Sequence, residues 1–226
     1  LYANLAVRGR RTDRIRADQL EPALALRPDL ASVMAGANDV LGAFDLDSTM
    51  RELETMYAEL RRVGATVIGC TFPDPGAVFS LAGRLTPRVR ALNAAIREAA
   101  DRHGVVLVDF EAQPAVNDPR WWSRDRLHLN TAGHTRLAAA FADGLGVRPD
   151  PSWREPLPPL SPRAWWRSRS EDAEWLARFW LPWLLRHLRG RSTGDDHPAK
   201  RPDLGPVLVI EELALGEVGP PPARPG

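Results

Sequence analysis

The stretch ATVIGCTF at residues 65–72 decides the fold of this 226-residue chain. It is apolar almost throughout and does not alternate with polar residues, which is typical of a strand buried on both faces. A Pro-Asp-Pro-Gly turn ends it at residues 73–76. Similar short runs at residues 1–7, 30–35 and 105–109 predict three further buried strands.

Helical patterns separate these runs, at about residues 12–25, 49–63, 87–103 and 131–145. Thr12 or Asp13 is the expected N-cap of the first helix. Ser48 and Thr49, with Glu52 three positions after Thr49, predict a capping box at the start of the second. Strands that alternate with helices imply crossover connections, and therefore a parallel sheet with helices on both sides.

Polar residues and glycines follow the predicted strands where a ligand would bind. Ligands of open parallel sheets bind beyond the carboxyl ends of the strands. Gly9 follows the first run, and Gly36 with Asn38 follows the second. Together with the loop that carries Asp125 and His128, they are expected along one edge of the sheet.

Asp125 and His128 form an acid–base pair just before the last helix. Acyl transfer needs a base, an acid that orients it, and donors that meet the oxyanion. His128 is the candidate base and Asp125 its orienting acid, while the Gly9 N–H and the Asn38 amide are candidate oxyanion donors. An Asp-X-X-His before a helix is, on its own, more often a capping or surface feature, and GAND at residues 36–39 could be a strand-ending turn. The prediction therefore depends on the joint occurrence of these features, in this order and at strand ends.

Three short motifs in order resemble the SGNH hydrolases, the GDSL-type lipase and esterase family: NLAVRG at residues 4–9, GAND at 36–39 and DRLH at 125–128. The resemblance covers about residues 1–147. It implies a flavodoxin-like three-layer α/β/α fold with a parallel sheet.

The resemblance also implies the roles given above to Gly9, Asn38, Asp125 and His128, with Gly36 and Asp39 as supporting residues. It implies a small ester, an acetylated sugar or a lipid-like molecule as substrate. It further implies that neither a metal nor an organic cofactor is needed.

The nucleophile is the part that this sequence does not supply. In the family it lies in a Gly-Asp-Ser block upstream of the Gly9 block. Ser32 lies inside a predicted strand, Ser48 is a predicted cap, and Ser80 and Ser123 have no strand-to-helix elbow around them. We therefore expect that the first strand and helix are missing, and that the chain as given is catalytically inactive.

The composition changes after residue 147, and most of the 21 prolines lie in the extension formed by residues 148–226. Within it, residues 171–189 predict an amphipathic helix, rich in Trp and Leu, with a kink at Pro182. Such a helix either packs back on the α/β domain or contacts a membrane surface or partner. Beyond Gly190 we expect disorder, with a possible short strand at residues 207–210.

The bulk composition excludes several classes of function. Thirty Lys and Arg residues against 29 Asp and Glu residues leave no basic excess for nucleic-acid binding. Cys70, the single cysteine, can form no internal disulfide and is predicted to be a buried, inert thiol. We therefore expect a cytoplasmic protein. The sequence contains no Cys/His cluster with metal-ligand spacing.

Two assignments stay open from the sequence alone. Trp121 and Trp122 either line an acyl or sugar pocket or belong to the core. The alternative functions are a non-catalytic binding or interaction module on the same fold, and docking through the Trp-rich helix.

Overall fold

A parallel sheet lies at the centre of the computed structural model. Its strands are β2 (Leu30–Ser32), β3 (Thr66–Cys70) and β4 (Val106–Val108), in that order across the sheet. Leu30 pairs with Thr66, and Ile68 pairs with Val106. The structure describes residues 1–78, 80–147, 151–159, 173–182, 194 and 197–207.

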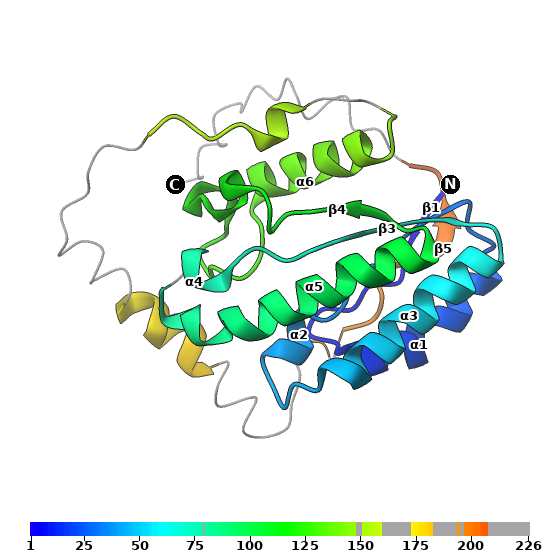
Figure 1. Cartoon of the computed structure of the whole chain (residues 1–226), viewed down its shortest axis with the longest axis horizontal. Helices are drawn as coiled ribbons and strands as arrows, with labels where there is room; N and C mark the ends of the chain where they lie inside the picture. Colours follow the sequence, from blue (N-terminus) through cyan, green and yellow to red (C-terminus); the bar gives the residue numbers. More distant parts are fainter. Residues whose placement is uncertain (79, 148–150, 160–172, 183–193, 195–196, 208–226) are drawn as a thin grey trace, which may run out of the picture.

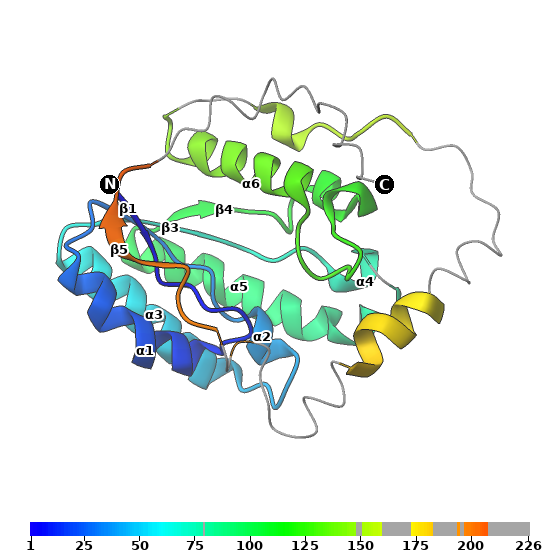
Figure 2. The ribbon, with the colours of Figure 1, turned by 180° about the vertical axis from the view of Figure 1, so that it is seen from behind.

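Helices cover both faces of this sheet and make three layers. On one side lie α1 (Thr12–Ala25), α3 (Leu46–Arg62) and α5 (Thr86–His103), and on the other lies α6 (Thr131–Gly144), as Figure 1 shows. The view from behind in Figure 2 shows the same order of layers. The predicted α/β fold with a parallel sheet is confirmed.

Shorter elements connect these layers or lie at the ends of the described ranges. They are β1 (Tyr2–Asn4), α2 (Ala37–Val40), α4 (Pro75–Val78), η1 (Ser80–Leu85), η2 (Pro114–Asn117), η3 (Pro119–Trp121), η4 (Pro151–Arg154), η5 (Leu176–Trp180) and β5 (Arg201–Gly205).

The central strand β3 contributes to a hydrophobic core on each face of the sheet. Successive side chains of a strand point to opposite faces. Val67 accordingly packs in the core with α3 and α5, whereas Ile68 and Cys70 pack in the core beneath α6. The expected burial on both faces is confirmed for β3. The outer strand β2 differs, because Leu30 is 50% exposed.

The prediction that residues 1–7 form a buried strand of the parallel sheet is wrong. β1 spans Tyr2–Asn4 and pairs antiparallel with β5 in a separate two-stranded sheet, with Tyr2 opposite Gly205. Both views place these two strands side by side near the N-terminus (Figures 1 and 2). Tyr2 is 46% exposed. Residues 2–4 of the apolar run therefore pair with β5 (Arg201–Gly205), which is remote in sequence.

Two helix starts also differ from the predicted caps. The N-cap of α3 is Asp45, whose carboxylate accepts a hydrogen bond from the Ser48 N–H at 3.0 Å. The helix therefore begins earlier than the predicted Ser48/Thr49 capping box. The N-cap position of α1 is Arg11, and its side chain makes no capping hydrogen bond. The end of α5 at His103, followed by Gly104 at φ 62°, agrees with the prediction.

Described parts of the predicted extension pack on the α/β domain. Trp153 of η4 is 3% exposed and meets Phe110 edge-on, with ring centroids 5.7 Å apart. Residues 173–182 are helical, while the rest of the predicted helix 171–189 lies outside the described residues. None of the helices in the described ranges is long and apolar enough to cross a membrane.

The sequence predicts disorder beyond Gly190, apart from a short strand or docking segment at residues 207–210. The structure instead has the strand β5 at Arg201–Gly205, which pairs with β1. Residues 208–210 lie outside the described residues.

A buried amide on α5 provides a test of this packing. Asn93 is 0% exposed, and its side chain accepts from the Phe72 N–H at 2.8 Å and donates to the Phe72 carbonyl at 2.7 Å. Asn93→Asp removes the donor and buries a charge, so we expect the free energy of unfolding to fall by about 2–4 kcal/mol in denaturant titrations.

Glu98→Gln is the control for this substitution, because the Glu98 side chain lies on the same helix and is 73% exposed. It should change the free energy of unfolding by less than about 0.5 kcal/mol. Equal effects of the two substitutions would contradict the structural role of Asn93.

Candidate active site

Asp125 and His128 lie in contact on the loop between η3 and α6. His128 Nδ1 is 2.7 Å from Asp125 Oδ2, which favours the tautomer that donates from Nδ1. The second ring nitrogen, Nε2, is then the one that can accept a proton. The His128 side chain is 61% exposed, so this nitrogen is accessible to a reacting group.

The other oxygen of the Asp125 carboxylate collects donors from its own loop. Oδ1 accepts the Ser123 hydroxyl at 2.6 Å and the backbone N–H groups of Leu127 and His128, each at 3.0 Å. Partial burial raises the pKa of Asp125, but the hydrogen bonds from Ser123 and His128 outweigh it and lower the pKa to about 2. The acid is therefore ionised throughout the neutral range and can stabilise a protonated imidazole.

The start of α6 anchors this loop. The Asn130 side chain accepts from the Gly133 N–H at 3.0 Å, which caps the helix, and donates to the Arg120 carbonyl at 2.7 Å. A Cβ on Gly133 would lie 2.2 Å from the Trp121 carbonyl oxygen, so only glycine fits there. Both residues follow His128 closely in sequence and hold it against η3.

The second group of candidate residues consists of Gly36, which precedes α2, and of Asn38 and Asp39, which lie within it. Gly36 has φ 113° and precedes the helix, a conformation that favours glycine. Asp39 is 2% exposed and accepts from both the Thr12 N–H at 3.0 Å and the Thr12 hydroxyl at 2.8 Å. A carboxylate from α2 therefore satisfies the first N–H of α1, where a negative charge is favoured.

The same contact brings the Gly9 segment to Asn38. The Asn38 amide Nδ2 donates to the Arg10 carbonyl at 3.0 Å, and Gly9, with φ 74°, immediately precedes that residue. Because an amide nitrogen carries two N–H groups, this bond leaves a second one for a ligand. The structure thus brings the two candidate oxyanion donors together, while their role stays a prediction.

The two groups share one edge of the sheet. Figure 1 shows α2, α4 and the beginning of α6 at the side where the parallel strands end. Within the described residues no hydrogen bond joins His128 to Asn38; the imidazole contacts Asp125, and the amide contacts Arg10.

The predicted pocket residues Trp121 and Trp122 differ in environment. Trp121 is 1% exposed, with the Arg136 guanidinium 5.0 Å from its ring centroid, so the core alternative holds for this side chain. Trp122 is half-buried, and its indole N–H donates to the Val116 carbonyl at 2.9 Å. A pocket role for Trp122 stays a prediction.

Four side chains with a hydroxyl or thiol were considered as nucleophiles, namely those of Ser32, Ser48, Ser123 and Cys70. Ser32 is in β2, and Ser48 is in the first turn of α3. The Ser123 hydroxyl lies 2.6 Å from Asp125 Oδ1 and 3.0 Å from the His128 backbone carbonyl, so its contacts are to the acid and to a backbone oxygen. Burial raises the pKa of the Cys70 thiol to about 12, which keeps it protonated and inert. No group of three or more His, Cys, Asp or Glu side chains that could hold a metal occurs among the described residues.

Two partners of the Asp125 loop were not predicted from the sequence. One is the Ser123 hydroxyl, and the other is the Trp175 indole N–H, which donates to the Asp125 carbonyl at 2.8 Å. A serine two residues before an aspartate is a local signal that could have suggested the first contact. No local signal points to Trp175, 50 positions away.

Comparisons with known proteins agree with this architecture. A model of the GDSL-like lipase/acylhydrolase family matches residues 1–136. A GDSL-like lipase from Bacteroides thetaiotaomicron superposes with a TM-score of 0.50 at 23% identity, over 61% of this chain and 72% of that one. An acetylxylan esterase from Geobacillus stearothermophilus gives 0.52 at 24% identity, over 61% and 68%. A search among curated proteins found no match.

The buried Asp39 carboxylate gives a first prediction for the site. Asp39→Asn keeps the shape but removes the charge at the start of α1, so the free energy of unfolding should fall by about 1–3 kcal/mol in denaturant titrations. Asp13→Asn is the matched control, because the Asp13 carboxylate is exposed on the same helix turn and its hydrogen bond is to the adjacent Arg14 N–H. A larger loss in the control would contradict the role of Asp39.

The Asp125 carboxylate gives a second prediction. In a carboxyl-detected NMR titration it should titrate at about 2, below the ordinary 3.8. Because the folded-state pKa lies below the unfolded one, ionised Asp125 stabilises the fold above about pH 4, and this contribution is lost as the pH falls to about 2. Ser123→Ala removes a donor and should raise the midpoint; an unchanged midpoint would exclude Ser123 as a cause.

Proposed function

Because the chain belongs to the GDSL-like lipase/acylhydrolase family, we propose that Asp125 and His128 are the acid and base of a serine-dependent ester hydrolase. The observation that carries the proposal is the 2.7 Å contact between His128 Nδ1 and the Asp125 carboxylate. It orients an exposed imidazole with Nε2 outward, as general-base catalysis requires.

In the proposed reaction His128 Nε2 takes the proton of a serine hydroxyl, whose oxygen bonds to the carbonyl carbon of an ester. The tetrahedral oxyanion accepts hydrogen bonds from the Gly9 N–H and the Asn38 amide. The imidazolium then gives its proton to the departing alkoxide as the ester bond breaks. A water molecule, deprotonated by His128, hydrolyses the acyl-serine and restores the enzyme.

We place the nucleophile on residues that precede Leu1. Two observations support this placement. The Ser123 hydroxyl is hydrogen-bonded to the Asp125 carboxylate at 2.6 Å and lies 3.0 Å from the His128 backbone carbonyl, which is a supporting position for the acid. Ser32 and Ser48 lie within a strand and a helix. On this proposal residues 1–226 alone are inactive, and a form that includes the upstream residues is the active one.

The proposed substrates are small carboxylic esters, acetylated sugars or lipid-like esters. The similarity to a solved acetylxylan esterase makes acetylated sugars the first class to test. A second proposal concerns the helix of residues 173–182, where Trp180 is 42% exposed and Leu181 is 47% exposed. We propose that this segment contacts a membrane surface or a partner.

Substitution of the base tests the proposal. In the form that includes the upstream residues, His128→Ala should lower kcat/KM for p-nitrophenyl acetate by about 10³-fold or more. His134→Ala is the control, because His134 is exposed on α6 and lies six positions further along the chain; it should leave kcat/KM unchanged.

Two outcomes would contradict the proposal. Turnover that survives His128→Ala would exclude the assigned base. An upstream sequence without a serine after an apolar strand would favour the alternative, a non-catalytic binding module on the same fold.

A further inference from the structure

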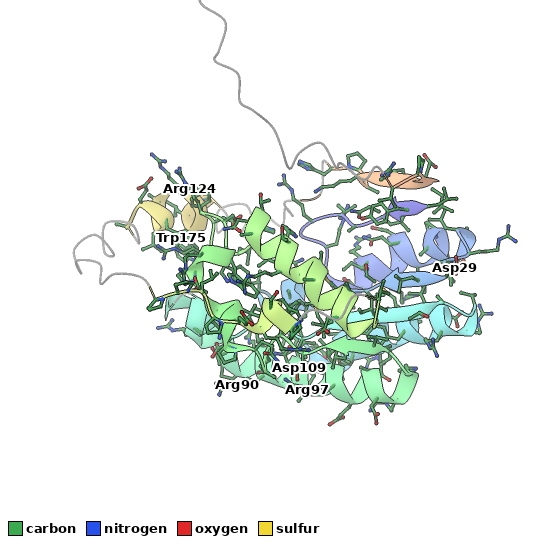
Figure 3. The ribbon with its side chains drawn as sticks, turned by 90° about the horizontal axis from the view of Figure 1, so that it is seen from above. Asp29, Arg90, Arg97, Asp109, Arg124 and Trp175 are labelled. Carbon is green, nitrogen blue, oxygen red and sulfur yellow. The ribbon has the colours of Figure 1, made fainter. Side chains whose placement is uncertain are left out.

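The helix of residues 173–182 is docked on the loop that carries the proposed acid and base. The Trp175 indole N–H donates to the Asp125 carbonyl at 2.8 Å, and the Arg126 guanidinium lies 5.7 Å from the centroid of the Trp175 ring. Figure 3 shows Trp175 beside Arg124 of the same loop. A side chain remote in sequence thus contacts the acid–base loop at two points, the Asp125 backbone carbonyl and the Arg126 side chain.

The peptide that Trp175 contacts, between Asp125 and Arg126, leads into a residue with an unusual backbone conformation. Arg126 has φ 57°, in the left-handed region that residues other than glycine rarely adopt. Residues other than glycine keep such a conformation only where the surrounding structure stabilises it. With Arg126 in this conformation, the N–H groups of Leu127 and His128 both reach the Asp125 carboxylate.

Trp175 stabilises this conformation from two sides. Its indole N–H satisfies the carbonyl of the peptide between Asp125 and Arg126, and its ring accepts the guanidinium of Arg126 as a cation–π partner. Together they favour the turn in which Asp125 and His128 face each other.

The burial of Trp175 distinguishes it from Trp180, the other tryptophan of residues 173–182. Trp175 is half-buried, whereas Trp180 is 42% exposed. On the same helix, Glu174 and Arg178 pair with each other at 3.0 Å and are both largely exposed. Trp175 is therefore the tryptophan through which this helix reaches the loop.

We propose that Trp175 is a positioning residue of the Asp125–His128 pair, acting through the peptide between Asp125 and Arg126. Its catalytic meaning rests on the function proposed above, but its effect on the loop does not. The helix of residues 173–182 thus helps to orient the base.

NMR of the full 226-residue chain tests the positioning role without any turnover. Trp175→Phe keeps a ring but removes the donor, and Trp175→Ala removes both contacts. We expect the Nδ1 proton of His128 to exchange with water about 5- to 10-fold faster in Trp175→Phe, and faster still in Trp175→Ala, since one hydrogen bond contributes about 1 kcal/mol. Trp180→Phe is the matched control and should leave exchange unchanged.

Kinetics then connect positioning to catalysis, in the form that includes the upstream residues. Trp175→Phe should lower kcat for p-nitrophenyl acetate by about 5- to 10-fold and change KM less than twofold, because it alters the base and not the substrate contacts. Thermal unfolding of each variant confirms that the comparison is between folded proteins.

The outcomes separate the two proposals. Unchanged proton exchange in both Trp175 variants would overturn the positioning role, as would an effect on KM alone. If the wild-type protein shows no turnover while Trp175→Phe still accelerates exchange, the proposed function fails and the positioning role stands.

Discussion

The oxyanion side of the candidate site depends on one buried carboxylate, that of Asp39. At 2% exposure the charged group needs donors in place of water, and it finds them in the backbone N–H and hydroxyl of Thr12 at the start of α1. This contact holds the segment around Gly9 against the turn at Gly36. The Asn38 amide then reaches the Arg10 carbonyl. The contact between Asp39 and Thr12 therefore positions both candidate oxyanion donors.

The acid–base pair does not depend on the contact between Asp39 and Thr12. It lies on the other face of the sheet, next to α6. Asp125 and His128 pair within one tight turn, and the first turn of α6 fixes the turn through Asn130 and Gly133. The sheet between the layers, with β3 buried on both faces, therefore sets the relation of the base to the oxyanion donors. Rigid elements of this kind favour a preorganised site.

Sequence reasoning succeeded where the signal is local and periodic. The apolar run at residues 65–72 identified the central strand, and the spacing of Asp125 and His128 suggested their contact. It failed at residues 1–7, because an apolar run does not say which strand it will pair with. It also missed the Asp45 cap, since Ser, Thr and Asp next to one another compete for the same position.

Hydrophobic periodicity and short motifs act over a few positions. They were therefore enough to predict the layers of the fold, the family resemblance and the residues worth testing. Three contacts became visible only in the folded chain: Asp39 accepts from Thr12 at the start of α1, β5 pairs with β1, and Trp175 donates to the acid–base loop. These contacts join residues between 27 and about 200 positions apart. Each is a specific contact without a repeating pattern along the sequence, so it forms only after packing has brought its partners together.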